Sequence, residues 1–388
     1  MEKDTIYLDK VYYVEKENSP EQIEQSQICI RDISSVSDYL RAITMIHSNY
    51  FILEYGRNVD IKYYENMFSR SETKDYLDNI IANGVYFRGQ TKDYQYVIPS
   101  LYRDLESIIF ESEFIKRSEI SSPNDFNSIN YFLSRLALMQ HYGLRTRILD
   151  ITTNALVALY FAVEDGNIKP TNADYDKVED GVVFLYKKEV PEIEVEFSEK
   201  ISTKANISQL SFCDKIALYQ AIQNSDIEDS TNLVDFFKTN SEISNILRKI
   251  SNLVQKDLGY PPMEILKSYL IGADIVYASE IDSRITRQNG LFFIWGLDGL
   301  QHASEEHNVN LENVKHTIDE TLKEKEFLYS PEVYLGVAHS TANVRIKIKK
   351  EYKAQLLSEL KLLGITGQSI YPDLQHKLDY INNLSMKI

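Results

Sequence analysis

The segment 154–163, Asn-Ala-Leu-Val-Ala-Leu-Tyr-Phe-Ala-Val, limits the possible folds more than any other part of the chain. Its composition predicts a helix that carries apolar side chains on nearly every face. Such a helix lacks the polar face that a surface helix turns to water, so it has to be covered on all sides. We therefore expect it near the centre of the molecule, with Thr152 or Thr153 as its N-cap.

Strand-like and helix-like patterns follow one another irregularly along the rest of the chain. Apolar or alternating stretches predict strands at 6–14, 28–30, 85–88, 181–186, 273–278, 291–295 and 344–348. Helical signals occur at 35–47, 74–82, 101–120, 133–140, 351–363 and 364–381, with a turn at 83–84. Because this order is not a strict βαβ alternation, the pattern favours the α+β class, with a mixed central sheet flanked by helices.

The length of 388 residues is more than twice the usual domain size. We expect a charged N-terminal extension at 1–27 and a core at 28–388. Within that core, residues 190–260 are acidic and rich in Asn and Ser, with helical spacing at 215–222, 233–237 and 243–254, and predict an inserted helical layer. Residues 344–388 predict a C-terminal strand–helix element.

Charge and cysteine usage narrow the class of protein. The formal net charge is −16 and the pI is about 5.0. A protein with this negative charge repels phosphate backbones, so a long nucleic acid is not the expected partner. The two cysteines, Cys29 and Cys213, form no CxxC pair, which predicts neither a metal site nor a disulfide framework and suits the cytoplasm. The charged N-terminus is unlike a signal peptide, and no apolar run approaches the roughly 20 residues of a membrane helix.

The first candidate site residue is an arginine at the end of a predicted strand, in Val-Tyr-Phe-Arg88-Gly89-Gln90. A glycine at this point lets backbone or a ligand approach closely. The planar guanidinium is a preferred fork for phosphate or carboxylate. Arg88 is therefore either the group that holds a ligand or a structural partner of a core carboxylate.

Two further clusters place arginine, amide and glycine together. The first, Gln140-His141-Tyr142-Gly143 followed by Arg145, Arg147 and Asp150, is a candidate anion pocket in an acidic chain. Its structural alternative is a His141 that caps a helix C-terminus and an internal Arg147–Asp150 ion pair. Asp150, Thr152 and Thr153 precede the central helix. The free N–H groups at the start of that helix can bind either a capping side chain or a phosphate.

The second of these clusters, with Arg284, Gln288 and Gly290, lies just before the strand expected at 291–295. Three arginine–glycine junctions in one chain suggest convergence on one face. The chain contains no GxGxxG, GxxxxGK[ST], HExxH or GxSxG motif, so none of the common nucleotide, metalloprotease or hydrolase signatures applies.

These clusters resemble the motifs of the FRG domain, a bacterial and phage-associated domain. Tyr86 to Gln90 is similar to its namesake motif. Similar motifs further along the chain are Gln140, His141, Gly143, Thr146, Arg147, Leu149, Asp150 and Thr152, then Arg284, Ile285, Gln288, Gly290 and Phe292, and finally Gly364-Ile365 with Ser369 to Leu374. Arg145 and Ile151 depart from the family, which often has proline and tryptophan there. The resemblance runs over about 28–381 and implies an intracellular domain found near mobile elements or defence genes.

The resemblance leaves two classes of function open. The first is an enzyme that acts on NAD as substrate, similar to an ADP-ribosyltransferase or NAD glycohydrolase and without a resident cofactor. Arg88 would hold a phosphate, with Gly89, Gln90, Arg147 and Arg284 nearby. His141 or Thr152/Thr153 would contact the ribose, and Glu280 or Gln288 would stabilise the oxocarbenium-like ribose as nicotinamide leaves. None of these candidate residues forms the Glu-X-Glu or Gln-X-Glu of the transferases.

The second class is a non-catalytic sensor that binds a nucleotide or a nucleic-acid end in the same pocket, aided by aromatic stacking from the 27 tyrosines. A scaffold with purely structural arginines is a third interpretation. The mobile elements and defence genes near which the family is found suggest a phage-defence or toxin-like effector. A small nucleotide is the expected ligand, and the sequence indicates no protein partner or oligomeric state.

Overall fold

The computed structural model describes residues 5–9, 13–14, 27–31, 33–47, 83–167, 177–189, 194–224, 241–259, 267–277, 290–304, 306–325, 328–329 and 342–371. The expected helices at 74–82 and 233–237 lie outside these residues, as does most of the expected terminal helix at 364–381. Within the described ranges, no helix combines the length and apolar content that crossing a bilayer requires.

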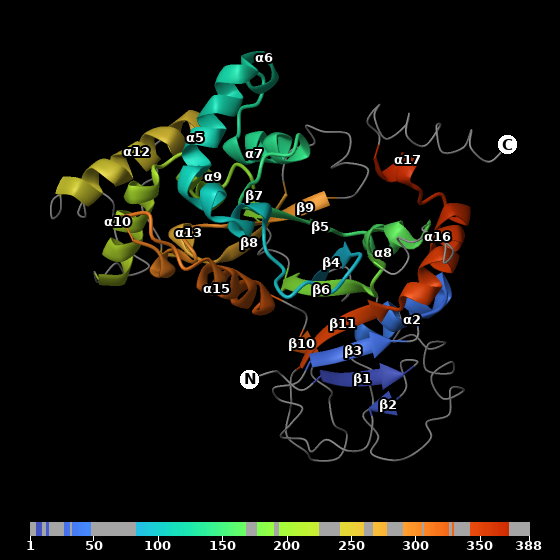
Figure 1. Cartoon of the computed structure of the whole chain (residues 1–388). Coiled ribbons are helices and arrows are strands. Elements are labelled where there is room, and N and C mark those ends of the chain that lie inside the picture. Colours follow the sequence, from blue (N-terminus) through green and yellow to red (C-terminus); the bar gives the residue numbers. More distant parts are fainter. Residues whose placement is uncertain are drawn as a thin grey trace.

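The described strands form one mixed sheet in the order β2-β1-β3-β11-β6-β4-β5-β9-β8-β7, with β10 paired to β11 (Figure 1). β3 runs parallel to β1 and to β11, β7 runs parallel to β8, and the other pairs are antiparallel. The strands are β1 (Thr5–Asp9), β2 (Tyr13–Val14), β3 (Gln27–Arg31), β4 (Asn83–Gln90), β5 (Ile148–Thr152), β6 (Gly181–Glu189), β7 (Glu194–Val195), β8 (Ala273–Tyr277), β9 (Gly290–Trp295), β10 (Leu328–Tyr329) and β11 (Ala342–Ile348).

Helices cover both faces of this sheet, which confirms the α+β class (Figure 1). The α-helices are α2 (Val36–His47), α5 (Leu105–Ser121), α6 (Pro123–Phe126), α7 (Phe132–His141), α8 (Ala155–Val163), α9 (Glu199–Ile207), α10 (Phe212–Asn224), α12 (Ser241–Leu258), α13 (Lys267–Leu270), α15 (Leu311–Lys323), α16 (Lys353–Leu362) and α17 (Gly367–Ile370). The 3-10 turns are η1 (Ser100–Arg103), η2 (Glu164–Asn167), η4 (Leu300–His302) and η5 (Lys350–Tyr352).

The two faces of the sheet carry separate cores. Along β4, Tyr86 packs with the cluster under α10, α12 and α15, whereas Phe87 packs with the cluster under α2, α8 and α16. This alternation is what the two-residue repeat of a strand requires. Buried residues of α9, α10 and α12 confirm the helical layer expected between 190 and 260, in its described parts.

Helix α8 lies directly on β4 and β6, as expected for an apolar helix at the centre. Glycine makes this close approach possible, because a Cβ on Gly89 would lie 1.8 Å from the Ala158 carbonyl oxygen. A Cβ on Gly181 would lie 2.1 Å from the Ala162 carbonyl oxygen. Gly89 therefore serves backbone packing, one of the two uses that the sequence left open.

Several local signals are confirmed. The helix expected from residue 35 begins with a capping box, in which Ser35 and Asp38 exchange side-chain to backbone hydrogen bonds of 3.1 Å each at the start of α2. The helix expected at 133–140 ends just before Gly143, whose φ of 91° is the left-handed conformation typical of a C′ glycine.

Other local expectations are wrong. Asn154, and not Thr152 or Thr153, caps α8, since its side chain accepts from the N–H groups of Leu156 and Val157. The turn expected at 83–84 is the start of β4, paired with β6. The helix expected at 101–120 is divided at Asp104, which ends η1 and caps α5.

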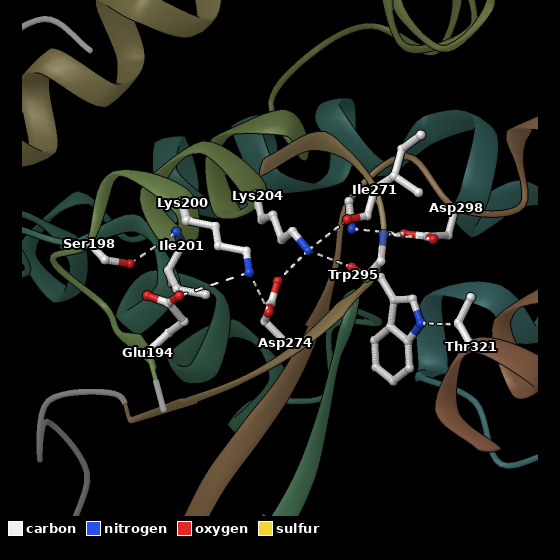
Figure 2. Close-up of polar contacts among 12 residues, drawn as sticks. Glu194, Ser198, Lys200, Ile201, Lys204, Ile271, Asp274, Trp295, Asp298 and Thr321 are labelled. Atoms are coloured by element: carbon white, nitrogen blue, oxygen red, sulfur yellow. Dashed lines mark hydrogen bonds and ion pairs between the residues drawn. The ribbon is translucent and has the colours of Figure 1, made fainter. Parts of the chain in front are cut away.

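A buried lysine attaches the helical layer to the far end of the sheet (Figure 2). Lys204 of α9 is fully buried, and its ammonium donates to the Ile271 and Gly272 carbonyls and to the Asp274 carboxylate. Lys200, one turn earlier, donates to the other oxygen of Asp274 at 2.7 Å. A buried charge is tolerated when it is paired and hydrogen-bonded in this way.

The sheet splits between β4 and β5. These strands pair only where Phe87 lies opposite Thr152, whereas β4 continues to pair with β6 as far as Gln90. β5 turns instead to β9, with which it pairs along its whole length. The segment from Arg88 to Gln90 therefore borders an opening on its β5 side.

Candidate ligand-binding site

A pocket of about 250 Å³ occupies this split in the sheet. Its lining comes from β4 and the loop after it, from η1, from β5, and from the end of α8. The lining residues are Phe87, Arg88, Gly89, Gln90, Thr91, Tyr94, Arg103, Asp150, Ile151, Thr152, Phe161 and Glu164. Because Arg88 and Gln90 alternate with Phe87 and Gly89 along β4, the lining draws on both faces of the sheet.

Arg88 spans the split. Its Nη1 donates to the main-chain carbonyl of Asp150 on β5 at 2.6 Å. Its Nε is buried and has no hydrogen-bond partner in the described part of the chain. The Nε–Nη2 edge of the guanidinium, the edge that binds a carboxylate or phosphate through two parallel hydrogen bonds, thus has no protein acceptor there.

The electrostatic surroundings of Arg88 leave its charge incompletely balanced. Burial lowers the pKa of Arg88 from its ordinary value, and the nearby charge of Arg103 lowers it further. Asp150 and Tyr186 act in the opposite direction without reversing the shift. An anion in the pocket would relieve this cost, since an opposite charge favours the charged form of a buried group.

Gln90 contributes a second lining side chain with an unsatisfied polar atom. Its side chain lies on the same face of β4 as Arg88 and is 9% exposed. Its Oε1 is buried and accepts no hydrogen bond from any described residue. A buried acceptor without a donor costs about 1–3 kcal/mol, so a pair of such groups at one pocket points to a ligand that satisfies them.

A chain of side-chain hydrogen bonds orients Asp150. The Gln140 amide, from the last turn of α7, donates to the Asp150 carboxylate at 2.7 Å. The Gln140 oxygen in turn accepts from the hydroxyl of Thr146, a buried residue just before β5. Asp150 is therefore held through its main chain by Arg88 and through its side chain by Gln140.

Lys353 of α16 fixes one edge of the pocket. Its ammonium is fully buried and donates at 2.7 Å both to the Thr91 carbonyl and to the Asp165 carboxylate. These bonds connect α16 with the loop after β4 and with η2. Two lining residues, Thr91 and Glu164, are thus held in place by one cation, directly or through a neighbour in the chain.

Arg147 does not belong to the pocket, which corrects both interpretations made from the sequence. It is 3% exposed and forms two hydrogen bonds with Glu111, while Nη1 donates to the carbonyls of Trp295 and Gly296. Lys215 of α10 donates to the same carboxylate at 2.6 Å. Arg147, Glu111 and Lys215 form a buried ion triad that ties the start of β5 to α5 and α10.

The remaining candidates divide into three groups. Gly89, Gln90, Asp150 and Thr152 line the pocket together with Arg88. His141 and Thr153 are not among the lining residues; the ring of His141 lies edge-on to Tyr142, with centroids 5.0 Å apart. Glu280, Arg284 and Gln288 lie outside the described residues, so convergence of the third cluster on this face stays a prediction.

The sequence patterns missed several lining residues. Arg103 lines the pocket but was not predicted, because no glycine or amide lies beside it in the sequence. Phe161 and Glu164 belong to the end of the apolar helix, where the change from apolar to acidic residues is the available signal. Tyr94, 47% exposed, lies under the Lys92 ammonium, 5.0 Å from its ring centroid.

Fold and site together define an α+β protein with a polar pocket in a split of its central sheet. Residues 83–170 match the FRG domain, so the chain is an FRG domain-containing protein, as its motifs predicted. Every lining residue of the pocket falls within this matched range. Neither curated proteins nor solved structures give a match. The wider extent expected for the domain, 28–388, stays a prediction.

Proposed function

We propose that this pocket binds a small nucleotide and that Arg88 holds its phosphate group. The observation that carries the proposal is the Nε of Arg88, a pocket-lining residue, which is buried and without a protein acceptor in the described chain. Nη1 is already fixed by the Asp150 carbonyl, so the fork is oriented before a ligand arrives. Preorganisation of this kind raises affinity, because less side-chain freedom is lost on binding.

Charge and size favour the same ligand class. Arg103 adds a second guanidinium at an exposed position of the lining, which supports an anionic ligand in a chain of net charge −16. The volume of about 250 Å³ lies below the roughly 300–1,000 Å³ of pockets for drug-sized ligands. It suits one phosphorylated sugar or one nucleotide unit, and a dinucleotide would have to extend beyond it.

Calorimetric titration of the full chain with AMP, ADP-ribose and NAD tests the proposal. We expect the wild type to bind and Arg88→Gln to lose about 10- to 100-fold in affinity. Arg88→Lys should regain only part of this affinity, because lysine keeps the charge but lacks the planar fork. The matched control is Arg145→Gln, since Arg145 is exposed, pairs with Asp104 and is not part of the lining. Equal affinities for Arg88→Gln and the control would overturn the proposal.

Cleavage of NAD is a second candidate, favoured by the two carboxylates in the lining. In such a reaction the glycosidic bond breaks, nicotinamide leaves with the bonding electrons, and water adds to the ribose carbon and loses a proton. Asp150 or Glu164 would stabilise the oxocarbenium-like charge. The side chain of Glu164 already accepts from the Tyr371 hydroxyl at 2.9 Å, which would hold it for this role.

Release of nicotinamide from NAD, with a label-transfer readout for ADP-ribosylation, tests this candidate. Turnover that Arg88→Ala and Glu164→Gln each abolish would support an enzyme. Nucleotide binding without turnover would support the sensor instead. A phage-defence or toxin-like role is proposed on the family resemblance alone; growth arrest on overexpression, relieved by Arg88→Ala, would support it.

A further inference from the structure

Gln90 and Arg88 require different groups on the ligand, because the Gln90 Oε1 accepts a hydrogen bond whereas Arg88 donates. Gln90 lines the pocket with a side chain that is nine-tenths buried, and its enclosed Oε1 accepts no hydrogen bond in the described chain. A phosphate group offers mainly acceptor oxygens, which can satisfy Arg88 but repel an amide oxygen. The ligand therefore has to bring a hydrogen-bond donor to Gln90.

We infer that this donor is a sugar hydroxyl, that the ligand class is a ribose phosphate, and that Gln90 is the residue that distinguishes it from the deoxyribose phosphate. The inference rests on the proposed function, because it takes Arg88 as the phosphate-binding group. Gln90 then reads the part of the ligand next to the phosphate.

The geometry of β4 fits a ligand of this size. Arg88 and Gln90 are two residues apart on one face of a strand, so their Cα atoms are separated by roughly 7 Å. An isolated phosphate ion is too small to satisfy both side chains. A sugar attached to the phosphate extends along the strand and carries hydroxyl donors to the second position.

The rest of the lining agrees with a ligand that has an anionic part and a hydroxyl-bearing part. The pocket combines two guanidiniums with two carboxylates, Asp150 and Glu164. A purely anionic ligand would be repelled by the carboxylates, whereas hydroxyl groups donate to them favourably. Loss of a ligand hydroxyl from a site built to receive it is strongly penalised, because the buried protein group is left unpaired.

The experiment is a thermodynamic cycle between the protein side chain and the ligand hydroxyl. The full chain is titrated calorimetrically with ribose 5-phosphate, 2-deoxyribose 5-phosphate, 3-deoxyribose 5-phosphate and inorganic phosphate. The proteins are the wild type, Gln90→Leu, and Gln355→Leu as the same change on an exposed face of α16. We expect the wild type and Gln355→Leu to bind ribose 5-phosphate about tenfold or more tightly than one of the deoxy compounds.

In Gln90→Leu this preference should disappear, because the acceptor that reads the hydroxyl is gone. Equal wild-type affinity for all three sugar phosphates would overturn the inference while leaving the phosphate site intact. A preference that persists in Gln90→Leu would overturn the assignment to Gln90. If no phosphorylated probe binds, the inference falls together with the proposed function. The far-UV and thermal unfolding profiles of the variants show that any lost preference is not lost folding.

Discussion

The Arg88 guanidinium and the Asp150 carbonyl are joined by a 2.6 Å hydrogen bond across the split between β4 and β5. In a continuous sheet this carbonyl could bond to a neighbouring strand, but the two strands pair only at Phe87 and Thr152. Arg88 thus connects the two strands where their ladder ends, while its Nε forms no hydrogen bond in the described chain. The structural partner of Arg88 is thus a main-chain carbonyl and not the core carboxylate that the sequence offered as one alternative.

Arg103 should contribute to binding mainly by long-range attraction. It is exposed and lines the pocket, and its Nη2 reaches the Ile98 carbonyl only at 3.5 Å. We expect Arg103→Gln to weaken nucleotide binding by about two- to fivefold at low salt, and less at high salt, because exposed charges are screened. Titrations at both salt concentrations check this. An effect as large as that of Arg88→Gln, and independent of salt, would place Arg103 in direct contact with the ligand.

Gly89 should be far less tolerant of substitution than Gly143. An alanine Cβ at Gly89 would meet the backbone of α8 at 1.8 Å, so α8 or β4 has to move. We expect Gly89→Ala to lower the free energy of unfolding by about 3 kcal/mol or more. Gly143→Ala meets no atom within 4 Å and carries only the strain of its φ of 91°, about 1–2 kcal/mol. Urea unfolding measures both; similar losses would contradict the close packing of α8 on β4.

Thr146 should act on the pocket through Gln140 and Asp150. Thr146→Val removes the hydroxyl that Gln140 accepts from, whereas Thr146→Ser retains it. We expect the valine variant to lose about 1 kcal/mol of stability and a few-fold in ligand affinity, because Asp150 is less firmly oriented. Thermal unfolding and titration provide the two readouts. Equal affinities for the valine and serine variants would show that this relay does not reach the pocket.

Features of the fold and of the site that are fixed by neighbouring residues could be predicted from the sequence, whereas features fixed by distant residues could not. The glycine beside Arg88 and the apolar helix that packs on it were both recognisable, because each reflects a strong local constraint. Strand β5 was not predicted, since its five residues carry an exposed Asp150 in the middle and directly precede a helix start. The pairing of β5 with β9, distant in the sequence, is what makes it a strand.

The same reasoning explains why the role of Arg147 was wrongly predicted. Its partner Glu111 lies 36 residues earlier in the chain, on α5. Nothing in the local sequence identifies that pairing, and Asp150, only three residues away, was the nearer carboxylate. The side chain of Asp150 accepts from Gln140 instead. Local spacing predicted a cluster of polar groups but not which of them would face each other.

The buried triad should make stability depend on pH in the alkaline range. Burial lowers the pKa of Lys215 from 10.5 to about 8; the Glu111 carboxylate partly offsets this effect, and the charge of Arg147 lowers the pKa further. Between about pH 8 and 10.5, the unfolded chain binds a proton at Lys215 that the folded chain has lost. Stability from this group alone therefore rises with pH through this window, by up to about 3 kcal/mol.

The variant Lys215→Met isolates this dependence, because subtracting its unfolding free energy from that of the wild type cancels the titration of the other groups. We expect the wild type to gain stability relative to Lys215→Met as the pH rises from about 8 to 10.5. Denaturant unfolding at several pH values provides the measurement. If the difference is flat, Lys215 stays charged through its bond to Glu111; if it falls with pH, the charged ammonium is favoured by folding. Either result would contradict the depressed pKa.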